Sequence, residues 1–205
     1  MFDAAVLTMP VPQILELPGM SEIINSETSE KLSKVQYSSR YALALFFDTY
    51  EEKISFDNSD PNIHQTSAEY ISDDPIFCYA AIDNAKRGLV GLQHPTSVVF
   101  HTNVPWGIKH LEDPLPEIEK ILLKHFKEKY PRWPEPKSVK CLRWRYSQIY
   151  KPYQNCPGAI ILNEKPLIIA GGDGFTEKSG LSCCIDSAQT ISNFLENNLW
   201  NIIRE

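Results

Sequence analysis

The residues that could best support chemistry lie in the stretch KPLIIAGGDGFTEKSGL, at positions 165–181. A short apolar run ends there at Gly171 and Gly172, which are followed by Asp173 and Gly174. A glycine costs ~0.5–1 kcal/mol relative to alanine in ordered structure. Glycine at three of four successive positions therefore indicates a tight turn and a close approach to the backbone.

A helical pattern begins shortly after this turn. A helix N-terminus offers unpaired backbone N–H groups and about half a positive charge, which suit a phosphate or another anionic group. Asp173 could accept hydrogen bonds from sugar hydroxyl groups. The alternative is a tight strand-to-helix turn closed by a hydrogen bond to the Asp173 side chain. The spacing alone supports both interpretations equally.

The elements around the turn must position these residues. The closing helix is expected to have Ser179 as its N-cap and to pack against the preceding sheet. Helical spacing predicts its apolar stripe to be Leu181, Ile185, Ala188, Ile191, Leu195 and Leu199. Short strands are predicted at 159–162 and 166–170, after a Pro–Gly turn.

The first half of the chain predicts a strand from Ala4 to Met9, ended by prolines, and then a short polar helix capped by Ser26 or Ser29. Residues 41–47 are predicted to form a largely buried strand. Residues 49–75 are polar and predict a hairpin or an irregular excursion. Five side chains of this excursion are expected to be buried: Ile54, Phe56, Ile63, Tyr70 and Ile71.

Further strands are predicted at 76–83, 97–104 and 138–149, with a turn at 84–88. Between the last two strands, an amphipathic helix ends before Pro131. One face of this helix carries Ile118, Ile121, Leu122, His125 and Phe126.

Composition excludes several classes of function. Twenty basic against 26 acidic residues give a net charge of −6, which argues against nucleic-acid binding. No apolar run approaches the roughly 18 residues that span a bilayer, and the N-terminus is a poor signal peptide, so a cytoplasmic chain is expected. The five cysteines lack C-x-x-C spacing and the five histidines are scattered, so neither disulfides nor a metal site is expected.

Several motifs resemble one known family. The segments VLTMPVPQIL, YSSRYALALFF, HTNVPWG, VKCLRWRYSQIY, NCPG and IIAGGDGFT occur in the order and at roughly the separations found in the renalase family. That family belongs to the glutathione-reductase/amine-oxidase superfamily of flavoproteins. The resemblance covers essentially the whole chain, as the C-terminal portion of such a protein. The combination of CLRWRYSQ, CPG and GGDGF is more specific than any single motif.

The resemblance implies a fold of α/β and α+β class. It combines a partial FAD-binding domain of glutathione-reductase type with a mixed-sheet substrate domain of amine-oxidase type. Residues 1–15 would end the FAD-domain strand, 16–140 would form the substrate domain, and 141–205 would form the C-terminal part of the FAD-binding domain. The family's N-terminal G-x-G-x-x-G fingerprint is absent, so a truncated form is expected.

The resemblance also implies FAD as the cofactor. Its contacts would be Gly171, Gly172, Asp173, Gly174, Phe175, Gly180 and Leu181. Asp173 would meet the ribityl or pyrophosphate portion, and Gly180 and Leu181 would face the isoalloxazine ring. Tyr41, His101, Trp106 and Trp144 are candidates for the substrate side, although aromatic residues in strands more often belong to the core. No catalytic acid or base stands out.

The reaction implied is oxidation of 1,2- and 1,6-dihydro isomers of NAD(P) to NAD(P)+, with O2 reduced to hydrogen peroxide. No protein partner is implied. Two alternatives stay open: a non-catalytic fragment that acts as a binding module, and a conventional FAD-dependent amine oxidase.

Overall fold

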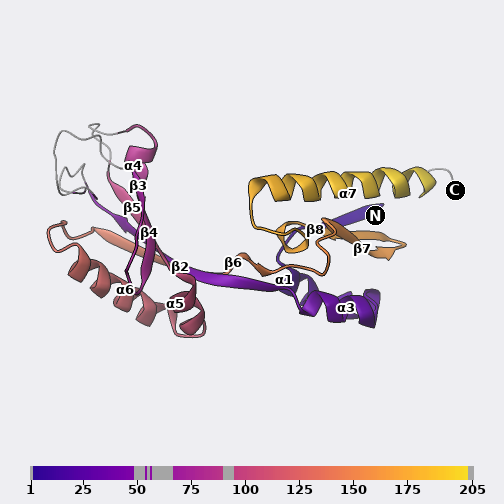
Figure 1. The fold of residues 1–205 in the computed structure, drawn as a ribbon, viewed down its shortest axis with the longest axis horizontal. Coiled ribbons are helices and arrows are strands. Elements are labelled where there is room, and N and C mark those ends of the chain that lie inside the picture. The colour runs from indigo at the N-terminus through magenta and orange to yellow at the C-terminus, as the bar shows by residue number, and fades with distance from the viewer. Residues whose placement is uncertain (1, 49–53, 55, 57–66, 90–94, 203–205) are drawn as a thin grey trace. The chain divides into compact units, whose positions relative to one another are not determined.

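The chain divides into two compact units. The computed structural model describes residues 2–48, 54, 56, 67–89 and 95–202. One unit comprises residues 1–38 and 146–205, and the other comprises residues 39–145. The chain passes between them twice, within the long strands β2 (Gln36–Phe46) and β6 (Ser138–Lys151) (Figure 1). The boundaries thus fall at 38/39 and 145/146, whereas the sequence suggested 15/16 and 140/141.

The first unit is built on a three-stranded sheet in the order β1-β8-β7. The strands are β1 (Ala4–Leu7), β7 (Ala159–Glu164) and β8 (Leu167–Gly171). β1 runs parallel to β8, and β7 runs antiparallel to it. The strands predicted in this part of the chain are therefore confirmed. A 3-10 turn, η1 (Asp173–Phe175), follows β8 directly.

Helices cover both faces of this sheet. Leu167 and Ile169 of β8 pack with Ile191 of helix α7 (Leu181–Ile202). Ile168 and Ala170, which point the opposite way, pack with residues of α1 (Val11–Leu15), α2 (Met20–Ile23) and α3 (Ser26–Ser33). The alternation of β8 side chains thus accounts for two hydrophobic clusters on opposite faces of one sheet.

Two helix details differ from the sequence predictions. The N-cap of α3 is Asn25, whose side chain accepts a hydrogen bond of 2.8 Å from the Thr28 N–H, and not Ser26 or Ser29. In α7, Ile191 is buried as expected, but Leu181 and Ile185 are 80% and 59% exposed. Ala188 is also exposed, whereas the neighbouring Ser187 is buried. The Leu199 side chain lies outside the described residues.

The second unit contains a five-stranded sheet in the order β3-β4-β5-β2-β6. The additional strands are β3 (Ala68–Tyr70), β4 (Phe77–Ile82) and β5 (Ser97–Thr102). The pairs β3–β4, β4–β5 and β5–β2 are antiparallel. The predicted strands at 76–83, 97–104 and 138–149 are confirmed, and the predicted turn at 84–88 begins instead as the short helix α4 (Asp83–Lys86).

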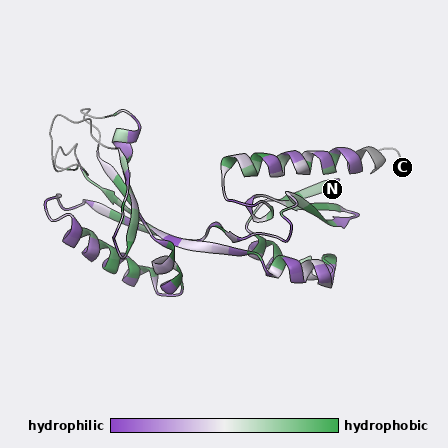
Figure 2. Cartoon of the chain, viewed as in Figure 1, coloured by the Kyte–Doolittle hydropathy of each residue, from purple (hydrophilic) through white to green (hydrophobic). Residues whose placement is uncertain are grey.

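One face of the five-stranded sheet packs against helix α6 (Leu115–Lys129), which follows α5 (Val104–Lys109). Figure 2 shows α6 with apolar residues toward the sheet and polar residues on the other side. Ile118, Leu122 and Phe126 are buried as predicted, whereas Ile121 is 41% exposed. Ile54 is also buried, but Tyr70, expected in the core, is 87% exposed. Ile63 lies outside the described residues.

Candidate functional site

The glycines of the turn after β8 are required by contacts within the first unit. A Cβ on Gly171 would lie 2.5 Å from Ile191 Cδ1, and a Cβ on Gly174 would lie 2.6 Å from the hydroxyl oxygen of Tyr37. Gly172 has φ +105°, in the region that favours glycine, and its Cβ would lie 3.3 Å from the Thr8 carbonyl oxygen. The close approach predicted from the sequence is therefore made by the chain itself at these three glycines.

Asp173 is held in place by a hydrogen-bond relay. The Ser179 hydroxyl donates to Asp173 Oδ2 at 2.7 Å and accepts from the Ile149 N–H at 2.6 Å. The relay joins the turn to β6, and it uses the side chain that was predicted to cap α7. The carbonyl of Gly180 accepts the first helical bond instead, from the Cys184 N–H at 3.0 Å. Among the described residues, Asp173 Oδ1 has no hydrogen-bond donor.

The open part of this site is the start of α7. A Cβ built on Gly180 would meet no atom within 4 Å, and Leu181 is 80% exposed. The first turn of a helix presents N–H groups without intrahelical partners and carries partial positive charge. Asp173 Oδ1, Gly180 and Leu181 therefore form the accessible part of the predicted cofactor site, whereas Gly171, Gly174 and Phe175 are buried within the fold.

Tyr37 of β2 belongs to the same site and was missed in the sequence. Its hydroxyl oxygen accepts a 3.4 Å hydrogen bond from the Val11 N–H and is the atom that excludes a side chain at Gly174. Burial raises the pKa of Tyr37 to about 12, and the nearby Asp173 carboxylate also raises it. Tyr37 therefore stays protonated. Its separation of more than 130 positions from the turn gave no signal in the sequence.

The four predicted substrate residues lie in the second unit, on opposite faces of its sheet. Tyr41 is fully buried, and its hydroxyl donates to the His110 carbonyl at 2.7 Å. The ring of Trp106 lies edge-on to that of Tyr41 at 5.7 Å and stacks on His110 at 4.3 Å. Tyr41 and Trp106 thus pack on the side of the sheet that α6 covers, where both contribute to the hydrophobic core.

His101 and Trp144 lie on the other face. Phe100, next to His101, and Cys141, three positions before Trp144, point into the core, and residues an odd number of positions apart in a strand face opposite sides. The two rings are 5.7 Å apart. His101 is paired in register with Tyr79 of β4, and Tyr79 with Tyr70 of β3. Ring centroids along this line are separated by 5.4 Å in both cases. We call Tyr70, Tyr79, His101 and Trp144 the aromatic row.

The small side chain of Ala42 leaves room for the contact between His101 and Trp144. Ala42 of β2 pairs with His101, so it lies on the strand between those of His101 and Trp144. Because the alanine side chain is short, the indole of Trp144 can reach across β2 to the imidazole of His101. Tyr70 and Trp144, the ends of the row, are 87% and 48% exposed. The row is therefore an accessible aromatic surface across the sheet.

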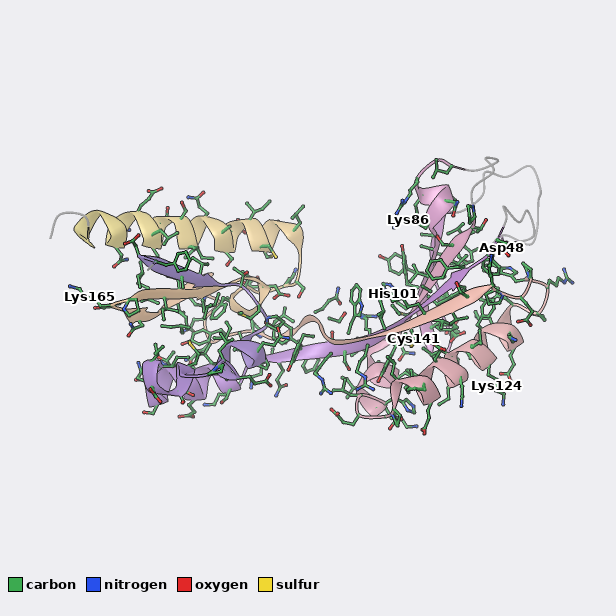
Figure 3. The ribbon with its side chains drawn as sticks, turned by 180° about the vertical axis from the view of Figure 1, so that it is seen from behind. Asp48, Lys86, His101, Lys124, Cys141 and Lys165 are labelled. Atoms are coloured by element: carbon green, nitrogen blue, oxygen red, sulfur yellow. The ribbon has the colours of Figure 1, made fainter. Side chains whose placement is uncertain are left out.

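Positive charge lies beside the aromatic row. Burial lowers the pKa of His101, and the charges of Arg40 and Lys86 lower it further, so the imidazole is neutral near pH 7. Figure 3 labels His101 and Lys86 in this unit. Arg40 Nη1 donates to the Thr102 carbonyl at 3.2 Å and to Cys78 Sγ at 3.1 Å. The row can thus offer stacking together with attraction for an anion.

The part of the chain that the structure describes holds neither a metal cluster nor a membrane-spanning helix. No group of three or more His, Cys, Asp or Glu side chains there could hold a metal ion. None of the helices described is both long enough and apolar enough to cross a membrane.

Comparison with known proteins identifies relatives of the chain. No protein-family profile matches it. Renalase from Mus musculus is 38% identical over 196 residues, which cover 95% of this chain and 54% of the mouse protein. The chain therefore spans about half the length of that curated relative.

Solved structures share the fold at low sequence identity. A protein from an Exiguobacterium species, named for protoporphyrinogen oxidase, matches with a TM-score of 0.59 and 16% identity, over 93% of this chain and 41% of its own. An oxidoreductase from Methanosarcina mazei matches with a TM-score of 0.54 and 15% identity, over 94% of this chain and 43% of its own. These matches establish a fold of mixed α/β type that larger oxidoreductases share.

Proposed function

We propose that this chain, a homologue of renalase, contributes to an FAD-dependent oxidase that acts on the 1,2- and 1,6-dihydro isomers of NAD(P). The observation that carries the proposal is the 38% identity with mouse renalase over 95% of the chain. One dihydro isomer, one O2 and one proton would give NAD(P)+ and hydrogen peroxide. When bound, FAD supplies the acceptor for the hydride and passes the electron pair to O2.

The accessible part of the turn in the first unit fits a flavin cofactor. Gly180 has open space around its Cβ position, and the first turn of α7 offers N–H donors to a carbonyl or a phosphate. Asp173 keeps Oδ1 available to a sugar hydroxyl, while Ser179 orients its other oxygen. In this proposal Gly171, Gly172, Gly174 and Phe175 shape the turn, and Asp173, Gly180 and Leu181 make the contacts.

The aromatic row would serve the substrate. In this proposal the unit of residues 39–145 acts as the substrate domain, and the other unit is part of the FAD-binding domain. His101 and Trp144 would stack on the nicotinamide ring of the substrate. His101, neutral near pH 7, would not repel a positively charged product ring. Tyr41 and Trp106 would support the opposite face of the sheet without touching the substrate.

Flavin binding is the direct test. The purified chain would be mixed with FAD, desalted, and measured for absorbance in the flavin bands, with Asp173→Ala as the matched variant. The proposal expects retained FAD and a weaker complex for Asp173→Ala. A chain that stays colourless after incubation with excess FAD would exclude oxidase activity of this polypeptide by itself.

Two alternative functions predict different results in the same assays. A conventional amine oxidase would release hydrogen peroxide with amines and not with dihydro-NAD(P) isomers, which a coupled peroxide assay separates. The second alternative is a non-catalytic binding module. It would retain the fold and show no flavin absorbance and no peroxide release with either substrate class.

A further inference from the structure

The tyrosine end of the aromatic row has no structural role that the described residues reveal. Tyr70 lies on the three-residue strand β3 and is 87% exposed, with its ring 5.4 Å from that of Tyr79. Tyr79 in turn contacts His101. A large aromatic side chain at such exposure adds little to the core, so its ring face is available to a planar ligand.

The charges near this end favour an anionic ligand. Arg87 forms an ion pair of 2.9 Å with Asp83, but the adjacent Lys86 is exposed and has no ion pair among the described residues. Lys86 and Arg40 both act electrostatically on His101, in the middle of the row. This positive charge lies beside the row in a chain whose net charge is −6. Aromatic faces beside positive charge suit nucleotides, in which a planar base accompanies phosphate.

We propose that Tyr70 and Tyr79 form an adenine subsite at one end of the aromatic row, with Lys86 as the cation for the phosphates of the same dinucleotide. The subsite rests on the proposed function, which assigns the nicotinamide ring to His101 and Trp144. A ligand with two rings joined by a pyrophosphate can then engage both ends of the row. The tyrosine pair thereby selects a dinucleotide over nicotinamide mononucleotide.

Separate titration of the two halves of the dinucleotide tests this subsite without FAD. AMP and nicotinamide mononucleotide would each be titrated into the full chain, with binding followed by ligand-observed NMR or calorimetry. Tyr70→Ala and Tyr79→Ala are expected to weaken AMP binding about tenfold each. Both variants should bind nicotinamide mononucleotide within about twofold of the unchanged chain. Tyr70→Phe should retain AMP affinity, because stacking needs only the ring.

Two further variants complete the experiment. Tyr150→Ala removes a tyrosine that is 73% exposed on β6 in the other unit, so AMP binding should be unchanged. Lys86→Gln should weaken AMP binding and reduce its dependence on salt concentration. The proposal is overturned if the unchanged chain shows no saturable AMP binding. It is also overturned if Tyr70→Ala binds AMP normally, or loses affinity for both mononucleotides equally. Failure of the chain to bind FAD would count against the proposed function, whereas the titrations with AMP and nicotinamide mononucleotide would still test the adenine subsite.

Discussion

Gly174, in the turn after β8, has no room for a side chain. A methyl group there would lie 2.6 Å from the Tyr37 hydroxyl oxygen and 3.0 Å from Val11 Cγ2. Overpacking of this kind costs ~1–3 kcal/mol. We therefore expect Gly174→Ala to lower the free energy of unfolding in urea by that amount. Adding Tyr37→Phe should recover part of the loss, because it removes the oxygen that clashes.

Gly180→Ala is the control for this prediction. Nothing lies within 4 Å of the added methyl group, so we expect its free energy of unfolding to stay within about 0.5 kcal/mol of the unchanged chain. Under the proposed function, the same variant should weaken FAD binding, since the methyl group would occupy the open space beside α7. Equal destabilisation by the two substitutions would contradict the packing account of the turn.

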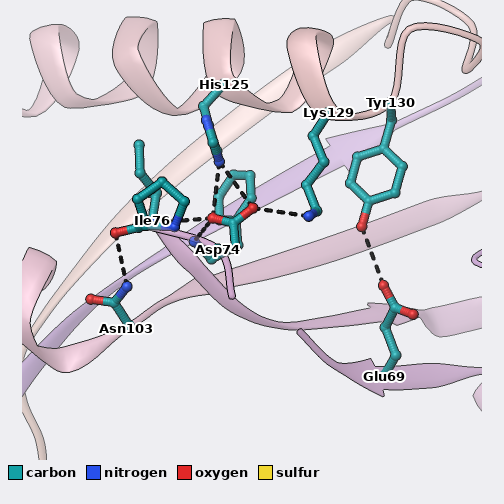
Figure 4. A network of polar contacts seen from close by, with 9 residues as sticks. Glu69, Asp74, Ile76, Asn103, His125, Lys129 and Tyr130 are labelled. Atoms are coloured by element: carbon teal, nitrogen blue, oxygen red, sulfur yellow. Dashed lines mark hydrogen bonds and ion pairs between the residues drawn. The ribbon is translucent and has the colours of Figure 1, made fainter. Parts of the chain in front are cut away.

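At the scale of elements, Asp74 joins the segment before β4 to helix α6 (Figure 4). Its side chain is 3% exposed and accepts from the N–H groups of Ile76 at 2.9 Å and Phe77 at 2.7 Å. His125 and Lys129 of α6 lie at 2.9 Å and 3.0 Å from its oxygens. Burial raises the pKa of Asp74, but these four partners together lower it from 3.8 to about 2. The ionised carboxylate therefore stabilises the folded unit.

The pKa of Asp74 predicts a pH dependence of stability. Because the folded-state value is depressed, the contribution is fully present above about pH 4 and is lost as the pH falls toward about 2. The size of the shift corresponds to about 2 kcal/mol. Asp74→Asn should lower the free energy of unfolding at pH 7 by roughly 2–3 kcal/mol and flatten its slope between pH 4 and 2. Urea titrations across this range measure both.

Asp83→Asn is the matched control, since its carboxylate pairs with Arg87 at the surface. Exposed ion pairs contribute ~0–1 kcal/mol, so we expect little change at pH 7 and an acid slope like that of the unchanged chain. If Asp74→Asn were to keep the acid slope of the unchanged chain, other carboxylates would account for the pH dependence.

Sequence patterns predicted elements better than they predicted contacts between elements. The period of α6 identified Leu122 and Phe126 as buried, because that helix packs with its apolar face on the sheet. In α7 the predicted stripe was wrong at Leu181 and Ile185, because the absence of a side chain at Gly171 lets Ser187 and Ile191 approach β8 and sets the rotation of the helix.

In the candidate sites, too, contacts between distant parts of the chain were not predicted from the sequence. The Gly–Gly–Asp–Gly turn was visible because its residues are adjacent in sequence. Tyr37 and the pairing of Asp74 with His125 were not visible, because these contacts join residues far apart in the chain. The aromatic row depends on strand register, so the sequence offered His101 and Trp144 singly and gave no reason to add Tyr70 or Tyr79.

At the scale of the whole molecule, the two units have separate hydrophobic cores. The cluster around Tyr41, Phe100 and Leu122 draws all its members from residues 39–145. The clusters of the other unit combine residues 1–38, including Val11 and Ile14, with residues after 146. One unit is thus continuous in sequence, whereas the other needs two distant segments.

This difference predicts how fragments behave. A fragment of residues 39–145 should fold alone and show a cooperative urea transition with dispersed amide NMR signals, because its core and most of its sheet are local to it. A fragment of residues 146–205 should not, because β8 loses its partner β1 and the cluster around Ile168 loses Val11 and Ile14. Adding a 1–38 peptide should restore dispersion to the second fragment. If the 39–145 fragment proved non-cooperative, the core of that unit would depend on the rest of the chain.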